Sequence, residues 1–396
     1  MSADFYGRIA AELETARAKG TYKESLFLES PMAPRVRMEG HGEVLVLSSN
    51  NYLGLANHPE VMKAGIEGIK NYGAGTGSVR FICGSFVIHR KLEKELADFL
   101  KKEAALSYVS CWNANTGLMP TIATEKDVLI SDEWNHASII DACRMAGAKV
   151  TRKVYKHSNM DELRKILEES KDFENRFVIT DGVFSMEGDI AKLPEIVELA
   201  RKYKAIIIMD DSHSTGVLGK SGAGTAEHFG LEKEVDIITS TLGKALGGAA
   251  GGFTAGRKEV IEYLFQKSRP MLFSNALPPT VAASALKAVQ VLRADPSLIK
   301  KLRENSEYFR KKLQEIGYKP LPGEAAIIPI ILGETSRAIA VSKKLLEKKI
   351  FVTGFGYPVV PEGTARIRIQ MSAALTRDDL DFALRVFKEL KTEIGM

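Results

Sequence analysis

The feature that most constrains the fold is an alternation, between residues 55 and 260, of short apolar runs with segments of helical periodicity. The helical pattern of Leu193–Lys202 is one such segment. Continuous apolar strands separated by helices are typical of a largely parallel sheet covered on both faces. Ligands of such sheets bind at the carboxyl ends of the strands. The expected strands are Ala105–Val109, Val128–Ile130, Phe177–Ile179, Ala205–Met209, Val235–Ile238 and Gly252–Ala255.

The length of 396 residues predicts two or three lobes. We expect an N-terminal helix and short strands over residues 1–50, a large α/β domain over 51–280, and a small C-terminal α+β domain over 281–396. Within the outer parts, the periodicity predicts the following elements. The helices are 3–19, 281–293, 296–315, 335–348 and one from 378, and the strands are 44–47, 327–332 and 365–371.

The composition is that of a soluble globular enzyme, with 45% hydrophobic and 27% charged residues. The net charge of +5 is spread among acidic residues, which argues against nucleic-acid binding but suits an anionic substrate such as a CoA ester. Cys83, Cys111 and Cys143 are too few and too scattered for a disulfide framework or a zinc site. We expect no metal, no secretory signal, no membrane span and a cytoplasmic location.

Two strand ends carry residues of complementary chemistry. Lys244 follows the run Val235–Ile238 within Thr241-Leu-Gly-Lys and precedes a cluster of glycines, while Asp210 ends the run Ala205–Met209. A carboxylate for a ring nitrogen and an amine for an aldehyde are what pyridoxal 5′-phosphate (PLP) requires. Thr241 is placed to reach its phosphate. Taken alone, Lys244 is equally compatible with a surface lysine in a glycine-rich loop.

Nucleotide-binding loops are excluded. Gly73–Gly77 follows a helical pattern and lacks the Rossmann spacing, and Gly219-Lys-Ser has Ser214 where a phosphate loop requires glycine.

Other candidates are individually weaker. His136, soon after the strand at Val128–Ile130, could stack on a pyridine ring, and the helix start at Ser110–Asn115 could seat a phosphate on its backbone amides. His213 lies three residues after Asp210 and could reach the cofactor's phenolic oxygen. Each histidine is also compatible with a structural role.

Arg366 and Arg368 alternate in Arg-Ile-Arg-Ile and would share one face of a strand. One of them could bind a substrate carboxylate through two parallel hydrogen bonds, although an exposed charged strand face is the more common explanation of such a pattern.

Together these motifs resemble the α-oxoamine synthases, PLP enzymes that join an amino acid to an acyl-CoA. The resemblance extends over essentially the whole chain. It implies an aspartate-aminotransferase-like fold, with a mostly parallel central sheet and a smaller C-terminal domain. The motifs that carry it are Asn50–Gly54, Asn135–Ser138, Thr180–Gly188, Asp210–His213 and Thr241–Lys244. Three further segments look most like the glycine C-acetyltransferase branch: Ser78–Gly84, Ser268–Asn275 and Val352–Pro361.

The resemblance implies that Lys244 is the Schiff-base lysine, Asp210 the partner of the ring nitrogen, and His136 the stacking residue. Asn50 and Arg368 would bind substrate. Phosphate and ring contacts would come from Cys111, Trp112, Ser185, His213 and Thr241, with Ser274 and Asn275 supplied by the partner subunit of a homodimer. Trp112 is bulkier than the family pattern leads us to expect.

The implied reaction is a reversible condensation of glycine with acetyl-CoA to 2-amino-3-oxobutanoate and CoA, as in threonine degradation. The alternative within the family is 8-amino-7-oxononanoate synthesis from alanine and a pimeloyl thioester for biotin, or an enzyme of both activities. A transaminase, a desulfurase-like lyase and a non-enzymatic cofactor-binding protein are the alternatives of other classes.

Overall fold

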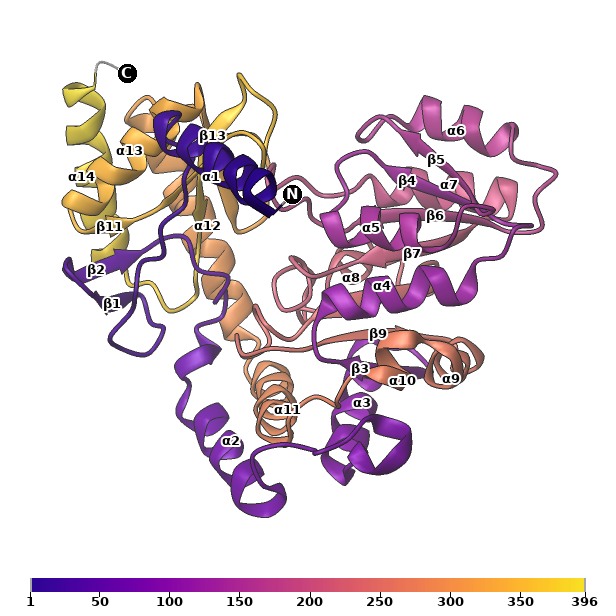
Figure 1. Ribbon diagram of the computed structural model, residues 1–396. Coiled ribbons are helices and arrows are strands. Elements are labelled where there is room, and N and C mark those ends of the chain that lie inside the picture. The colour runs from indigo at the N-terminus through magenta and orange to yellow at the C-terminus, as the bar shows by residue number, and fades with distance from the viewer. Residues whose placement is uncertain (1, 395–396) are drawn as a thin grey trace. The chain divides into compact units, whose positions relative to one another are not determined.

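The computed structural model describes residues 2–394 and divides into two compact units (Figure 1). The larger unit comprises residues 50–185 and 189–302, and the smaller comprises 1–49, 186–188 and 303–396. The domain boundaries predicted after residues 50 and 280 stay a prediction.

A seven-stranded sheet in the order β3-β9-β8-β7-β6-β4-β5 is the centre of the larger unit. The strands are β3 (Ala104–Tyr108), β4 (Val128–Asp132), β5 (Thr151–Tyr155), β6 (Arg176–Asp181), β7 (Ile206–Asp210), β8 (Ile237–Thr241) and β9 (Gly252–Gly256). The strands from β8 to β5 are parallel, whereas β9 pairs antiparallel with both β3 and β8. The expectation of a largely parallel sheet is therefore confirmed.

The reversal of β9 follows from the length of its connection to β8. Only residues 242–251 separate the two strands, and a parallel return requires a crossover of a dozen or more residues. The run at Gly252–Ala255 is thus a strand as predicted, but it enters the sheet in the opposite direction.

Helices cover the sheet on both faces, since every residue of β4 and β9 is buried. Figure 1 shows α4 beside β9, and α4 also packs against β8 and α5. The longer helices are α2 (Pro59–Tyr72), α3 (Val87–Leu100), α4 (Cys111–Ile122), α5 (Ala137–Met145), α6 (Met160–Glu168), α7 (Leu193–Tyr203), α9 (Lys258–Lys267) and α11 (Pro279–Ala294). The short ones are η1 (Leu55–Asn57), η2 (Arg80–Gly84), α8 (Thr225–His228) and α10 (Arg269–Phe273).

The smaller unit contains two three-stranded sheets, β1-β2-β11 and β10-β13-β12. The strands are β1 (Arg35–Met38), β2 (Gly42–Val46), β10 (Ile327–Gly333), β11 (Ile350–Phe351), β12 (Thr353–Phe355) and β13 (Ala365–Gln370). Its helices are α1 (Ser2–Ala18), α13 (Thr335–Glu347) and α14 (Arg377–Glu393), and α12 (Ser297–Glu315) begins in the larger unit. The buried rings of Phe309 and Phe387 meet edge-on in its core.

The elements predicted for these outer parts are present, with ends that differ by a few residues. Strand β5 was not predicted, because it is one of the sheet's two edge strands and only its last residue, Tyr155, is buried. Among residues 2–394, none of the helices is long and apolar enough to span a membrane, and the same residues contain no acidic, cysteine and histidine cluster able to hold a metal.

Candidate active site

A cavity of about 220 Å³ lies in the larger unit, where several parallel strands end. Asp181 ends β6, Asp210 ends β7 and Thr241 ends β8, so the topology brings three polar strand ends to one edge. The cavity is lined by Ser110, Cys111, Trp112, His136, Ser138, Asp181, Ser185, Asp210, Ser212, His213, Thr241 and Lys244. It therefore collects all the predicted cofactor-binding residues except Ser274 and Asn275.

Asp210 is a buried carboxylate surrounded by donors. Its Oδ2 accepts a hydrogen bond from Asn115 Nδ2 at 2.6 Å, and its Oδ1 accepts one from the backbone N–H of Ser212 at 3.0 Å. The thiol of Cys111 donates to Oδ2 at 3.5 Å, and burial raises the pKa of that thiol well above its usual value, so it stays protonated. These three donors hold the carboxylate group in one orientation.

Lys244 approaches the cavity from the loop after β8. Its Nζ lies 2.8 Å from His213 Nε2, and His213 Nδ1 lies 2.8 Å from the hydroxyl of Tyr52. Two N–H groups cannot share one hydrogen bond, so one of the two facing nitrogens offers a lone pair. The three side chains form a continuous chain along which a proton can pass.

His136 lies in the turn after β4. Its backbone N–H donates to Asp181 Oδ2 at 2.8 Å, and its ring meets the ring of Trp112 edge-on, with centroids 6.1 Å apart. Burial lowers the pKa of His136, an effect that the charge of Asp210 opposes and that of Lys244 reinforces. Burial, together with the charge of Asp210, raises the pKa of Asp181 well above its usual value.

The amino end of α4 offers backbone amides to the same cavity. The Ser110 hydroxyl accepts the N–H of Asn113 at 3.1 Å and caps the helix. The amides of Cys111 and Trp112 belong to the first helical turn, where no intrahelical carbonyl is available to them. The approach of β9 requires glycine, because a Cβ at Gly252 would lie 2.2 Å from the backbone nitrogen of Cys111. A helix start of this kind attracts anions such as phosphate.

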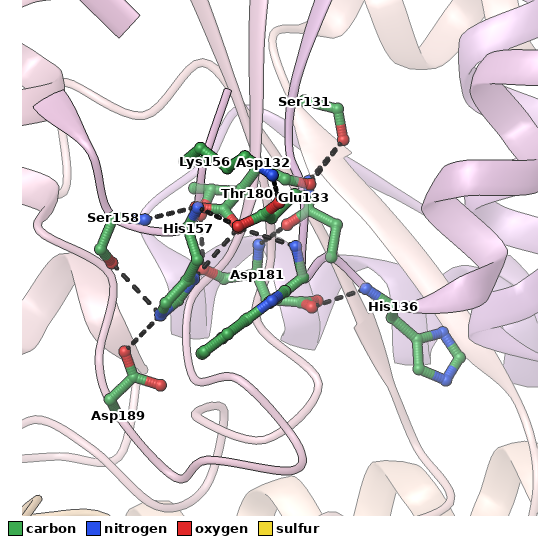
Figure 2. Close-up of polar contacts among 12 residues, drawn as sticks. Ser131, Asp132, Glu133, His136, Lys156, His157, Ser158, Thr180, Asp181 and Asp189 are labelled. Atoms are coloured by element: carbon green, nitrogen blue, oxygen red, sulfur yellow. Dashed lines mark hydrogen bonds and ion pairs between the residues drawn. The ribbon is translucent and has the colours of Figure 1, made fainter. Parts of the chain in front are cut away.

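A charged cluster lies beside His136 and involves the loops that carry His136 and Ser185 (Figure 2). The ring of His157 bonds Asp132 Oδ1 at 3.1 Å and Asp189 Oδ2 at 2.9 Å, and it stacks on Trp134 at 4.0 Å. Burial alone would lower the pKa of His157, but the bonds to both carboxylates prevail and raise it to about 9. His157 thus joins Asp132, which precedes the turn that carries His136, to Asp189, which follows the loop that carries Ser185.

The remaining predicted residues have other surroundings. Ser274 and Asn275 follow α10, and Asn275 forms an isolated antiparallel β-bridge with Val79. Asn50 begins the larger unit. Arg368 lies on β13 of the smaller unit, over the ring of Phe355 at 4.7 Å.

Arg366, the alternating neighbour of Arg368, is buried and forms an ion pair with Glu187 at 2.8 Å in the smaller unit.

Sequence reasoning missed Tyr52, Asn115 and Ser138 as members of this site. All three lie inside motifs that the sequence had singled out, at Asn50–Gly54, Ser110–Asn115 and Asn135–Ser138. Their spacing alone gave no signal, because each one contacts a residue distant in the chain.

The family model of aminotransferase classes I and II matches residues 42–387. The 8-amino-7-oxononanoate synthase of Thermoanaerobacter pseudethanolicus is 47% identical over 98% of both chains. The 2-amino-3-ketobutyrate coenzyme A ligase of Escherichia coli is 44% identical over 100% of both. This chain is an α-oxoamine synthase of the aminotransferase class I and II family.

Solved structures agree with this assignment. The serine palmitoyltransferase of Sphingomonas wittichii superimposes with a TM-score of 0.92 at 29% identity, covering 98% of this chain and 97% of that one. A high-resolution structure of such an enzyme with PLP gives 0.93. The fold predicted for this α-oxoamine synthase and its cofactor, PLP, are thereby confirmed.

Proposed function

We propose that this α-oxoamine synthase is a cytoplasmic enzyme that condenses glycine with acetyl-CoA, reversibly, to give 2-amino-3-oxobutanoate and CoA. The observation that carries the chemistry is the presence of Lys244 and the buried Asp210 in one cavity. The choice of substrates is supported by the resemblance of Ser78–Gly84 and Val352–Pro361 to the glycine-acetylating branch.

The cavity fits PLP, which when bound supplies a reactive aldehyde and a ring that accepts electrons. Lys244 would hold the aldehyde carbon through Nζ. Asp210 would keep a proton on the ring nitrogen, since its carboxylate is buried and fixed by Asn115 and Ser212. The α4 amides and the Thr241 hydroxyl would hold the phosphate, with His136 and Ser185 beside the ring.

Proton movement belongs to Lys244. Its Nζ would take the α-proton of glycine as general base. His213 and Tyr52 hold that nitrogen in place and provide the lone pair or proton it needs in each state. Arg368 would bind the glycine carboxylate through its paired donors, with Asn50 beside the substrate.

A homodimer with shared sites is part of the proposal. Phe81 and Ile82 of η2 are 55% and 68% exposed, and Phe273 of α10, a helix that contacts η2, is 70% exposed. Large apolar side chains gathered at a surface mark an interaction site. Ser274 and Asn275 follow Phe273 directly, so covering this surface with a second copy would carry them towards that copy.

The dimer is tested by mixing two inactive variants, Lys244→Ala and Ser274→Ala. We expect partial recovery of activity in mixed dimers. A fully active monomer in sedimentation analysis would contradict the shared site.

The second candidate is 8-amino-7-oxononanoate synthesis, which the 47% identical relative favours. Measuring CoA release for glycine or alanine with acetyl- or pimeloyl-CoA separates the two. We expect glycine with acetyl-CoA to have the highest kcat/KM. Each additional methyl or methylene group that the pocket excludes should lower kcat/KM by about 10- to 200-fold. The highest value for alanine with pimeloyl-CoA would replace our proposal by this second reaction.

A further inference from the structure

Asn115 is a buried amide that joins two residues of the cavity. It lies in α4 with no exposed surface, and its Nδ2 donates to Asp210 Oδ2 at 2.6 Å and to Ser138 Oγ at 2.9 Å. Its Oδ1 accepts the hydroxyl of Thr239 at 2.7 Å. Nearly all the hydrogen-bonding capacity of this amide is therefore used within the protein.

The orientation of the amide follows from the charge beside it. An ionised carboxylate only accepts hydrogen bonds, so the NH₂ group of Asn115 must face Asp210. The oxygen then faces Thr239, whose hydroxyl can donate to it. If the NH₂ group and the oxygen of the Asn115 amide exchanged places, the buried Asp210 carboxylate would lose a donor.

Ser138 forms hydrogen bonds with both Asn115 and His136. Because the Ser138 hydroxyl accepts from Asn115, its own proton is available for His136 Nδ1, which lies 2.8 Å away. The backbone N–H of Ser138 also points at Nδ1, at 3.3 Å, since His136 is the N-cap of α5. A proton on Nδ1 would face this N–H directly.

We infer that Asn115 is a positioning residue that holds His136 as the neutral tautomer, with its proton on Nε2. The inference rests on the proposed function in one respect, namely the role of the Asp210 carboxylate as partner of the PLP ring nitrogen. Burial, which lowers the pKa of His136, keeps the ring neutral against the charge of Asp210, and Lys244 acts in the same direction. His136 therefore offers one N–H donor to an oxygen of the bound reactants.

Nitrogen-15 NMR of histidine-labelled, PLP-loaded enzyme tests the inference directly, with His136→Gln used to assign the resonances. We expect an unprotonated Nδ1 and a protonated Nε2 at pH 7.5. A proton on Nδ1, or an imidazolium ring, in enzyme that binds PLP would overturn the inference alone. Wild-type protein that shows no PLP absorption band would overturn the proposed function, and with it the inference.

The role of Asn115 is tested by Asn115→Leu, which removes both donors at similar volume. We expect its PLP affinity to fall about 10- to 100-fold, as for other buried groups left unsatisfied, and the two His136 nitrogens to approach tautomeric averaging. Ser138→Ala should alter the same resonances even if Asn115→Leu fails to fold. Thr116→Val is the matched control, since that hydroxyl bonds only the carbonyl of Trp112 in the same helix. Unchanged His136 resonances in both Asn115→Leu and Ser138→Ala would refute the positioning role.

Discussion

Replacing Asp210 by asparagine removes one charge while preserving shape, and it probes the proposed chemistry most directly. Both carboxylate oxygens accept hydrogen bonds, Oδ2 from Asn115 and Oδ1 from the Ser212 N–H. An amide has a single oxygen, so one of these donors loses its acceptor. That loss costs about 1–3 kcal/mol.

The larger effect is on the reaction rate. At ordinary hydrogen-bond distance, about 3 Å, and an effective dielectric constant of about 20, a carboxylate and a protonated ring nitrogen attract by about 5 kcal/mol. If the transition state depends on that proton, Asp210→Asn should lower kcat by about 10³- to 10⁴-fold, since each 1.36 kcal/mol or so is tenfold in rate. The assay is CoA release from acetyl-CoA at saturating glycine and PLP.

The neighbouring residue provides the matched control. Asp211 is also buried, but it bonds the hydroxyl and N–H of Thr225, and burial raises its pKa to about 6. Asp211→Asn should lower the melting temperature and leave kcat within a few-fold. A folded Asp210→Asn enzyme with activity within tenfold of wild type would refute the reasoning, as would an equal loss in both variants.

Lys244→Ala should abolish turnover, and borohydride reduction of wild-type enzyme should attach the pyridoxyl group to the peptide containing Lys244; a label on another lysine would remove the assignment. Arg368→Ala should raise the KM for glycine far more than that for acetyl-CoA, whereas equal rises would indicate a different ligand. The pKa of His157 is raised from 6.5 to about 9, so its stabilising effect is complete below pH 6.5 and is lost as pH rises through 9. The free energy of unfolding should therefore fall between pH 7 and 10 by up to about 3 kcal/mol more in wild type than in His157→Gln, and parallel curves would contradict the ion-pair cluster.

The parts of the fold that were predictable are those whose residues show their environment locally. Strands buried on both faces, such as β4 and β7, are continuous apolar runs, and the residues that follow them mark the cavity edge. Strand β5 alternates and resembles a loop, because it lies at the sheet's edge. The direction of β9 depended on the length of a connection rather than on composition.

The candidate site divides in the same way. Lys244 and Asp210 could be proposed because a strand end and an unusual residue type coincide in the sequence. Asn115 could not, since its partners Asp210 and Thr239 lie 95 and 124 residues away in the chain and become neighbours only when the sheet forms. The sequence around a single asparagine does not indicate which distant residues it will contact in the folded chain.

The reversed strand β9 also sets the distance between the ends of its two neighbours, β3 and β8. It lies between β3, which leads into the amino end of α4, and β8, which leads into Lys244. Two strand spacings of about 4.8 Å put these two strand ends about 10 Å apart. Gly252, the first residue of β9, pairs with Tyr108 at the end of β3 and with Thr241 at the end of β8, and therefore fixes this separation without presenting a side chain. Chains that keep this topology keep this separation, so any change in the size of the reactants they accept has to come from the side chains around the cavity.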